Sequence, residues 1–175
     1  AREGYIEDGV AMSPLSSYIG KAHTTTLISF REAVPVGTVS IVVDCADPLP
    51  MDALFLSELR VLRTQGARLG EVCQFAIDHE DGYIDPSVSI TLFGHTLRTL
   101  SDAGCTHAVC VVNPRHAAFY QSLGGERLGE EKAYPGVNGA PAQAYVVDLR
   151  MLEHRVLASE NPILTKIWSV AHNES

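Results

Sequence analysis

The sequence lacks the features of a membrane-spanning or secreted protein. No apolar run among its 175 residues approaches the roughly 20 residues that cross a bilayer. The polar start, AREGYIEDG, has no apolar segment of the kind found in a signal peptide. These two absences predict a cytoplasmic protein without a membrane span.

Positive charge and metal-binding cysteine patterns are also scarce. The formal net charge is −8, which would repel the phosphates of nucleic acids and argues against them as partners. The cysteines show no CxxC spacing, so we expect no metal site and no disulfides. Three of them lie in apolar, strand-like segments, where free buried thiols are common. The four are Cys45, Cys73, Cys105 and Cys110.

Nucleotide-binding motifs, internal repeats and low-complexity linkers are absent as well. Neither GxGxxG nor GxxxxGK[ST] occurs, which argues against the nucleotide-binding folds. What is present is an ordinary globular composition, with 46% hydrophobic and 19% charged residues. We therefore expect a single domain over residues 1–175, with its core at about 23–150 and a C-terminal tail at 151–175.

Residue patterns predict a hairpin and then a helix in the first part of the chain. Threonine and β-branched residues predict strands at His23–Glu32 and Thr38–Val43, with VPVG (34–37) as the turn between them. A loop with two prolines follows at 44–50. An apolar stripe at helical spacing then predicts a helix over Asp52–Thr64.

The rest of the chain alternates between strand and helix. A helix is expected over Ser87–Ala103, with Asp85 as its cap and Pro86 at its first position. Further strands are expected at Gly70–Ile77, His107–Val112 and Gln143–Leu149, and further helices at Pro114–Leu123 and Met151–Leu157. Apolar residues in the tail predict packing on the domain or on a partner chain. These are Ile163, Leu164, Ile167, Trp168 and Val170.

Five segments, in this order, resemble one family of enzymes. They read GTVSIVVD, LPMDALFLSELRVLR, LGEVCQFAID, NPRHAAFY and VNGAPAQAYVVDL. Together they resemble the GNAT acyltransferases, and among these the long-chain N-acyl amino acid synthases, which are related in fold to the acyl-homoserine-lactone synthases. The likeness runs from about Thr24 to Leu149.

This resemblance implies an α/β (α+β) fold with a GNAT-type mixed, mostly antiparallel central sheet flanked by helices. It also implies transfer of an acyl group from a thioester to the amine of an amino acid or a similar small molecule. The donor is acyl carrier protein or acyl-CoA, and members of this branch often use the carrier protein. A catalytically degenerate acyl-binding or regulatory module on the same fold is the alternative.

The donor site departs from the usual GNAT pattern. A typical GNAT holds the coenzyme A pyrophosphate on a Q/R-x-x-G-x-G/A turn at a helix N-terminus. The corresponding segment here, DHEDGYIDPSVS, lacks that spacing and is acidic, which favours a carrier-protein donor. Free helix N–H groups at Ser87, Val88 and Ser89 remain candidates for holding one phosphate. The acidic residues are Asp78, Glu80, Asp81 and Asp85.

Carrier protein is acidic, so its docking needs a local cationic patch on this negatively charged chain. Candidates are Arg63, Arg68 and Arg115. The Gly/Pro-rich segment from Tyr134 to Tyr145 is long for a turn, and we interpret it as a lid over the acceptor.

Glu71 is the candidate base for removing a proton from the amine. It lies on a strand with Cys73 on the same face, and burial between apolar strands would raise its pKa. In the family that the chain resembles, this strand carries an E-x-S-R pattern. Here Cys73 and Gln74 stand in place of the serine and arginine, and we expect them on the substrate side. Glu58, in F-x-x-E-x-x-x-L-R, is a second candidate for substrate binding. Structural pairing is the alternative for both carboxylates, with Arg63 or the backbone as the partner of Glu58.

The segment NPRHAAFY supplies the remaining candidates. Asn113 ends a strand and would cap the next helix, at the place where GNAT strands separate to admit the thioester. Tyr120 matches the tyrosine that protonates the departing thiolate. His116, one turn earlier, would orient that phenol or contact a donor phosphate. The alternatives are a core aromatic residue and an exposed histidine without a role.

Overall fold

The computed structural model describes residues 16–18, 20–78, 85–135, 138–158 and 161–173. A six-stranded sheet with the strand order β1-β2-β3-β4-β6-β5 forms its centre. The pairing of β3 with β4 is parallel and the other four pairings are antiparallel. The strands are β1 (Thr24–Arg31), β2 (Val34–Val43), β3 (Leu69–Ile77), β4 (His107–Val112), β5 (Glu126–Tyr134) and β6 (Ala140–Asp148).

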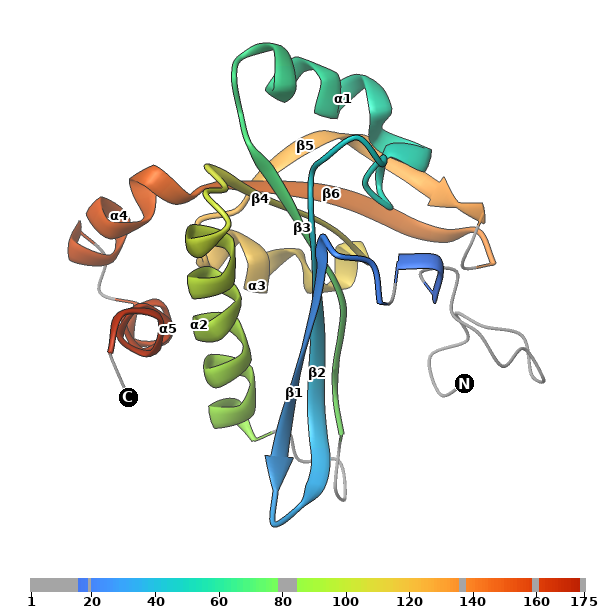
Figure 1. Cartoon of the computed structure of the whole chain (residues 1–175). Helices are drawn as coiled ribbons and strands as arrows, with labels where there is room; N and C mark the ends of the chain where they lie inside the picture. The colour runs from blue at the N-terminus through green and yellow to red at the C-terminus, as the bar shows by residue number, and fades with distance from the viewer. Residues whose placement is uncertain (1–15, 19, 79–84, 136–137, 159–160, 174–175) are drawn as a thin grey trace.

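Helices flank this sheet. In Figure 1, α1 lies across one end of the sheet, α2 runs along one face, and α4 and α5 lie beside α2. The helices are α1 (Asp52–Thr64), α2 (Pro86–Asp102), α3 (Ala117–Ser122), α4 (Leu152–Ala158) and α5 (Pro162–His172). Short 3-10 turns occur at η1 (Ser16–Tyr18), η2 (Pro114–His116) and η4 (Leu149–Met151). The arrangement confirms the predicted mixed, mostly antiparallel sheet flanked by helices.

The predicted first hairpin is present, but its turn lies elsewhere. Residues 34–37 belong to β2, and the chain reverses at Glu32 and Ala33, whose φ angles are 48° and 69°. Two consecutive positive φ values suit the right-handed twist of a two-residue hairpin. Neither residue is a glycine or an asparagine, so the usual sequence signal for this turn is missing. Pro35 is tolerated because it lies at a register irregularity between β1 and β2.

Two elements of the structure have no counterpart in the predictions. Strand β5 reads ERLGEEKAY and is largely exposed at the sheet edge, so it lacks the apolar alternation of a half-buried strand. Because β5 pairs with β6 and β6 begins at Ala140, the segment expected to be a lid is mainly the end of a hairpin. Helix α5 is the second element, and the side chain of Asn161 caps it.

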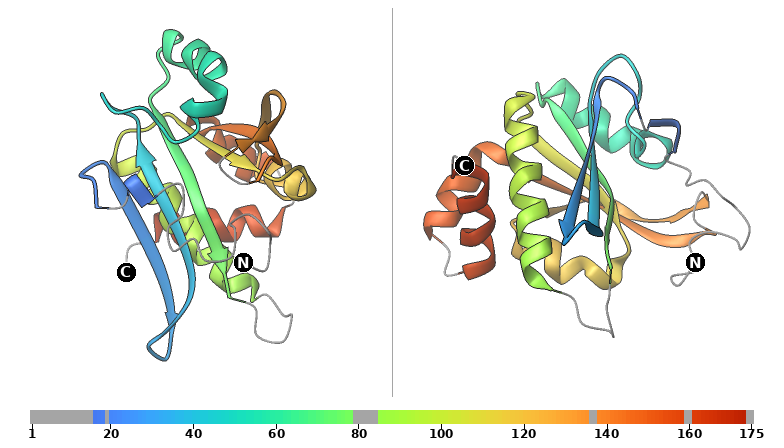
Figure 2. Two further views of the ribbon diagram at one scale, coloured as in Figure 1. Left: turned by 90° about the vertical axis from the view of Figure 1, so that its right-hand side faces the viewer. Right: turned by 60° about the horizontal axis from the view of Figure 1, so that its bottom comes forward.

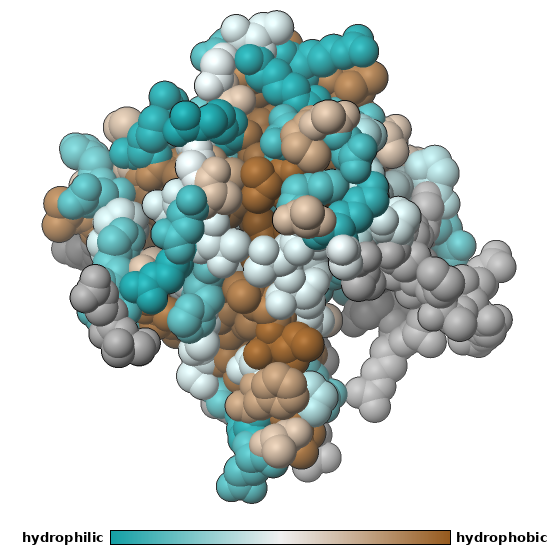
Figure 3. Space-filling view, viewed as in Figure 1, coloured by the Kyte–Doolittle hydropathy of each residue, from teal (hydrophilic) through white to brown (hydrophobic). Residues whose placement is uncertain are grey.

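The two faces of the sheet have different coverings. On β3, Glu71 and Cys73 point to the face where Met51 and Phe55 pack, whereas Val72 points to the face covered by α2. Apolar side chains are also exposed at the outer part of the β1–β2 hairpin, where Figure 3 shows brown and tan surface. These are Ile28, Phe30 and Val34.

Candidate active site

The central feature of the site is an opening between β3 and β4. These parallel strands are paired at three positions, the last of which joins Glu71 to Val109. Beyond it, β3 continues beside β2 while β4 stays paired with β6. Figure 2 shows the two halves of the sheet diverging. Glu71 is therefore the last residue of β3 that pairs with β4, and it lies where the two strands begin to separate.

Glu71 is a buried carboxylate, with 3% of its surface exposed. Burial raises its pKa to about 8, and the nearby negative charge of Asp52 adds to the shift. The backbone N–H of Met51 donates a hydrogen bond to Oε2 of Glu71 at 2.9 Å, and this bond lowers the pKa of Glu71. The predicted upward shift is therefore present, and its main cause is loss of solvation. Such a carboxyl group can gain or lose a proton near neutral pH.

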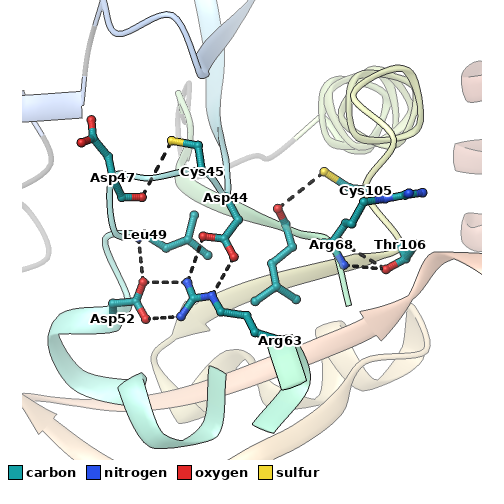
Figure 4. Close-up of polar contacts among 10 residues, drawn as sticks. Asp44, Cys45, Asp47, Leu49, Asp52, Arg63, Arg68, Cys105 and Thr106 are labelled. Carbon is teal, nitrogen blue, oxygen red and sulfur yellow. Dashed lines mark hydrogen bonds and ion pairs between the residues drawn. The ribbon is translucent and has the colours of Figure 1, made fainter. Parts of the chain in front are cut away.

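The loop before α1 brings Met51 to Glu71, and an ion-pair cluster holds this loop. Arg63 contacts Asp44 and Asp52, each at 2.7 Å, and Asp52 accepts a hydrogen bond from the Leu49 N–H at 2.8 Å (Figure 4). Burial opposes ionisation of Asp52, but the hydrogen bonds from Arg63 and Leu49 hold its pKa below the usual value.

Glu58 is paired within the fold, as its structural alternative expected, but its partner is not Arg63. Arg63 binds Asp44 and Asp52, so its guanidinium group is already engaged by two carboxylates. Glu58 instead pairs with Lys132 of β5 at 2.6 Å. That lysine was not singled out from the sequence because β5 itself was not predicted. A substrate-binding role for Glu58 stays a prediction, and its carboxylate is already engaged.

Three further polar side chains lie near enough to Glu71 for its charge to affect their pKa values. Burial, together with the Glu71 charge, raises the pKa of Cys73 to about 12 and also raises the pKa of the Tyr18 and Tyr134 phenols. The thiol and both phenols are therefore protonated at neutral pH. Sequence reasoning missed both tyrosines as site residues, although Tyr134 opened the segment interpreted as a lid. These groups form the polar surroundings into which an amine could be placed.

Gln74 takes an unusual backbone conformation just beyond the opening. Its φ is 53°, in the left-handed region that non-glycine residues rarely occupy. Its Oε1 accepts a hydrogen bond from the Ser40 hydroxyl at 2.8 Å, and Ser40 also contacts the Thr26 hydroxyl at 2.9 Å. The side-chain oxygen of Gln74 is thus used within the sheet. Its role in substrate binding stays a prediction.

An apolar cavity of about 70 Å³ lies on the opposite face of the sheet, between β3, β4 and β6 and helices α2 to α5. Tyr120 forms part of its wall and stacks on Tyr145, with 6.1 Å between the ring centroids. Burial raises the pKa of Tyr120, and Cys110 contributes. Burial and the charge of Glu71 in turn raise the pKa of Cys110 to about 12. Cys110 lines the cavity together with Tyr120, whereas Glu71 lies with Met51 on the other face of the sheet.

The segment after β4 is only partly as predicted. Asn113 accepts a hydrogen bond from the Arg115 N–H at 3.1 Å, which confirms its capping role, although the helix begins as a 3-10 turn. His116 is exposed, and its Nε2 lies 2.9 Å from Nε of Arg115. His116 therefore lies with Arg115, while Tyr120 packs among aromatic rings. The donor-binding roles of Asn113 and His116 and the catalytic role of Tyr120 stay predictions.

The N-terminus of α2 does not offer the free amides that were expected. Asp85 caps the helix as predicted, and its Oδ1 accepts from the Ser87 N–H at 2.9 Å. The Val88 N–H bonds to the Asp85 carbonyl at 3.2 Å, and the Val88 side chain is buried. The expectation was therefore wrong for these two amides, and Ser89 stays a prediction. Glu80 and Asp81 lie outside the described residues.

Within the described parts of the chain, no group of three or more His, Cys, Asp or Glu side chains is placed to hold a metal ion. The same residues contain no helix that is both long and apolar enough to span a membrane. All four cysteines are free thiols.

A family model and a solved structure identify the same family of proteins. The family model for the N-acyl amino acid synthase FeeM matches residues 1–148. The solved structure of FeeM, from uncultured soil microbes, is 32% identical, with 85% of this chain and 83% of that chain covered and a TM-score of 0.76. No curated protein matches the chain.

More distant structures show the fold. The CoA-dependent acyl-homoserine lactone synthase MesI is 16% identical over 89% of this chain and 72% of that chain, with a TM-score of 0.55. An N-acetyltransferase from Staphylococcus aureus Mu50 is 11% identical over 73% of this chain and 69% of that chain, with a TM-score of 0.51. These similarities confirm the GNAT-like fold that was expected.

Proposed function

The chain belongs to the FeeM family of N-acyl amino acid synthases and is a GNAT-like acyltransferase that acylates amino acids. We propose that Glu71 is the base that deprotonates the amine and that Tyr120 donates a hydrogen bond to the leaving sulfur. The observation that carries this proposal is the position of Glu71. A buried carboxylate with a pKa of about 8 lies where the pairing of β3 with β4 ends, at the opening of the sheet. Family membership favours this enzyme over a non-catalytic acyl-binding module.

The chemistry begins with the amino group of the acceptor. This group is an ammonium ion near neutral pH and must lose a proton before its nitrogen can attack. Glu71, in its ionised form, takes that proton. The amine nitrogen then bonds to the thioester carbonyl carbon, and a tetrahedral intermediate forms. When this intermediate collapses, the carbon–sulfur bond breaks and an amide and a thiolate result. The nitrogen gives up two protons in all, of which one ends on the sulfur and one is released to solvent.

Tyr120 is suited to stabilise the sulfur of the leaving group. Its raised pKa keeps the phenol protonated, so it can donate a hydrogen bond to negative charge that develops on sulfur. It lines the apolar cavity, which we propose receives the part of the acyl chain next to the thioester. Cys110 follows Val109, which pairs with Glu71, and it lines the cavity together with Tyr120, so we propose that the amine and the thioester meet at this point of the sheet.

For the donor, we propose acyl carrier protein in preference to acyl-CoA. The carboxylate of Asp85 occupies the N-terminus of α2, where a typical GNAT binds pyrophosphate, and its charge would repel a phosphate. Arg115 and Arg68 remain as exposed cations for docking an acidic carrier. MesI is described as CoA-dependent, so acyl-CoA is the competing donor. A cytoplasmic location is part of the same proposal.

The test is amino acid-dependent thiol release from purified protein with acyl carrier protein or acyl-CoA of the same chain length. A higher kcat/KM with the carrier protein supports it as donor, and a higher value with acyl-CoA rejects that part of the proposal. Release without any amino acid would indicate hydrolysis and contradict the synthase mechanism.

Variants assign the residues. Glu71→Gln is expected to lower kcat by about 10²–10⁴-fold, the range typical of general-base removal. Tyr120→Phe keeps the ring and removes the donor, and a 10-fold or greater loss of kcat is expected. Glu130→Gln, on the exposed surface of β5, is the matched carboxylate control and should retain activity. Full activity of Glu71→Gln would reject the base.

A further inference from the structure

The C-terminal segment forms one wall of the apolar cavity. Leu149 and Leu152 line it from η4 and α4, and Leu164 and Ile167 line it from α5. The family model ends at residue 148. This wall therefore comes from a part of the chain that the family match does not include.

Helix α5 is closely seated on α2. A side chain at Gly94 of α2 could not fit, because an added Cβ would lie 3.0 Å from the Ile167 carbonyl oxygen and would overlap Val170. Arg98 of α2 donates to the Ala171 carbonyl at 3.0 Å and so holds the last turn of α5. In Figures 1 and 2, α5 runs beside α2 on the side away from β1 and β2. The close contact between α5 and α2 therefore fixes Leu164 and Ile167 at the cavity wall.

The cavity is small for an acyl chain. Its volume of about 70 Å³ is roughly half that of the 150 Å³ cavity known to take up a benzene molecule. It has room for only a few methylene groups, so the side chains that end it would limit how much of the chain is buried. Each methylene that becomes buried strengthens binding by roughly fourfold.

We propose that α5 sets the acyl-chain preference of this enzyme, with Leu164 and Ile167 as the residues that limit length. This inference rests on the proposed function, because it takes the cavity as the acyl site. Removing either side chain adds space at the wall and favours longer donors. Enlarging either side chain removes space and favours shorter donors.

The experiment measures kcat/KM for a series of acyl donors of increasing chain length with one amino acid. Leu164→Ala and Ile167→Ala are expected to move the preferred length upward, with a gain of roughly fourfold for each additional methylene accommodated. Ile167→Phe is expected to move it downward. Ile163→Ala, on the exposed side of the same helix, is the control and should keep the wild-type profile.

A second readout separates this inference from the proposed function. Non-hydrolysable acyl thioester analogues of the same lengths are added, and the rise in the unfolding temperature is recorded for each protein. If the wild type releases no thiol but its stabilisation still depends on chain length and shifts in the variants, the proposed function fails and the inference holds. If folded, active variants keep the wild-type length profile in both assays, the inference is wrong. Ile167→Phe fills space instead of leaving a cavity, so it still tests the inference if the alanine variants do not fold.

Discussion

The N–H of Met51 donates a 2.9 Å hydrogen bond to the carboxylate of Glu71 across 20 positions of sequence. It is the one backbone hydrogen bond that lowers the pKa of this group, against the larger effect of burial. The loop that delivers Met51 is itself held by Asp52 and Arg63. The protonation of the proposed base thus depends on a cluster of charges beside it.

Catalysis should depend on pH through Glu71. The base works in its ionised form, so kcat/KM is expected to rise as the pH passes through about 8 and to level off above it. A pH–rate profile for the wild type tests this. Glu71→Gln should show a lower rate without that rise. A profile already flat between pH 6 and 9 in the wild type would contradict the assignment.

Stability should show the opposite trend. The folded-state pKa of Glu71 is about 8 and the ordinary value is 4.5, so between these pH values the folded state binds the proton more strongly than the unfolded state. The free energy of unfolding is then expected to fall as the pH rises through this window, by up to about 1.4 kcal/mol per pH unit from this group.

Urea unfolding of the wild type and Glu71→Gln at several pH values between 5 and 9 measures this trend. Glutamine cannot ionise, so the difference in unfolding free energy between the two proteins should change steadily with pH. A constant difference would show that Glu71 is not perturbed.

The ion-pair cluster should be important for stability. Arg63→Met leaves the carboxylates of Asp44 and Asp52 without their partner in a partly buried setting, and a loss of about 3 kcal/mol is expected. Arg60→Met removes an exposed arginine from the same helix and should cost less than about 0.5 kcal/mol. Urea unfolding compares them. Equal effects would mean that the cluster contributes only surface charge.

Arg63 also acts on the site as a positioning residue. Because Arg63 holds the loop that carries Met51, its loss should move the pH midpoint of kcat/KM upward as the hydrogen bond to Glu71 weakens. A merely structural role would lower the amount of folded enzyme and leave that midpoint unchanged. The pH–rate profile of folded Arg63→Met distinguishes the two.

Thr96 on α2 offers a stabilising substitution. Its hydroxyl is buried at the cavity wall, and no hydrogen-bond partner for it occurs among the described residues. Thr96→Val replaces the hydroxyl with a methyl group of similar size and is expected to raise the unfolding free energy by about 1 kcal/mol. Thr99→Val is the control, because the Thr99 hydroxyl already donates to the His95 carbonyl at 2.8 Å. A destabilised Thr96→Val would show that this hydroxyl has a partner.

Local chemistry accounts for the features that sequence reasoning predicted. Asp85 and Asn113 cap the turns that follow them because a short oxygen-bearing side chain reaches the next backbone N–H within two residues. The strand containing Glu71 and Cys73 was predicted, and the alternation of side chains along a strand placed both residues on one face. The resemblance of five ordered segments gave the fold and the acyl-transfer chemistry.

Features that depend on distant contacts were not predictable in this way. The turn at Glu32 and Ala33 and the exposed strand β5 have weak local signals, since pairing with β2 and β6 holds them in place. Tyr18 of η1 and Tyr134 of β5 are far from Glu71 in the chain and come near it only through the tertiary fold.

The linear chain therefore specified helices, strands, caps and the residue types of an acyltransferase, because these follow from interactions within a few residues. The partner of Glu58, the cavity beside Tyr120, and the Met51 and Asp52 neighbours that act on the pKa of Glu71 arose from packing between segments far apart in the chain. Burial and charge neighbours act through space, and no local pattern of residues encodes them. For the same reason, α5 could be recognised as one wall of the cavity only once its contact with α2 was known.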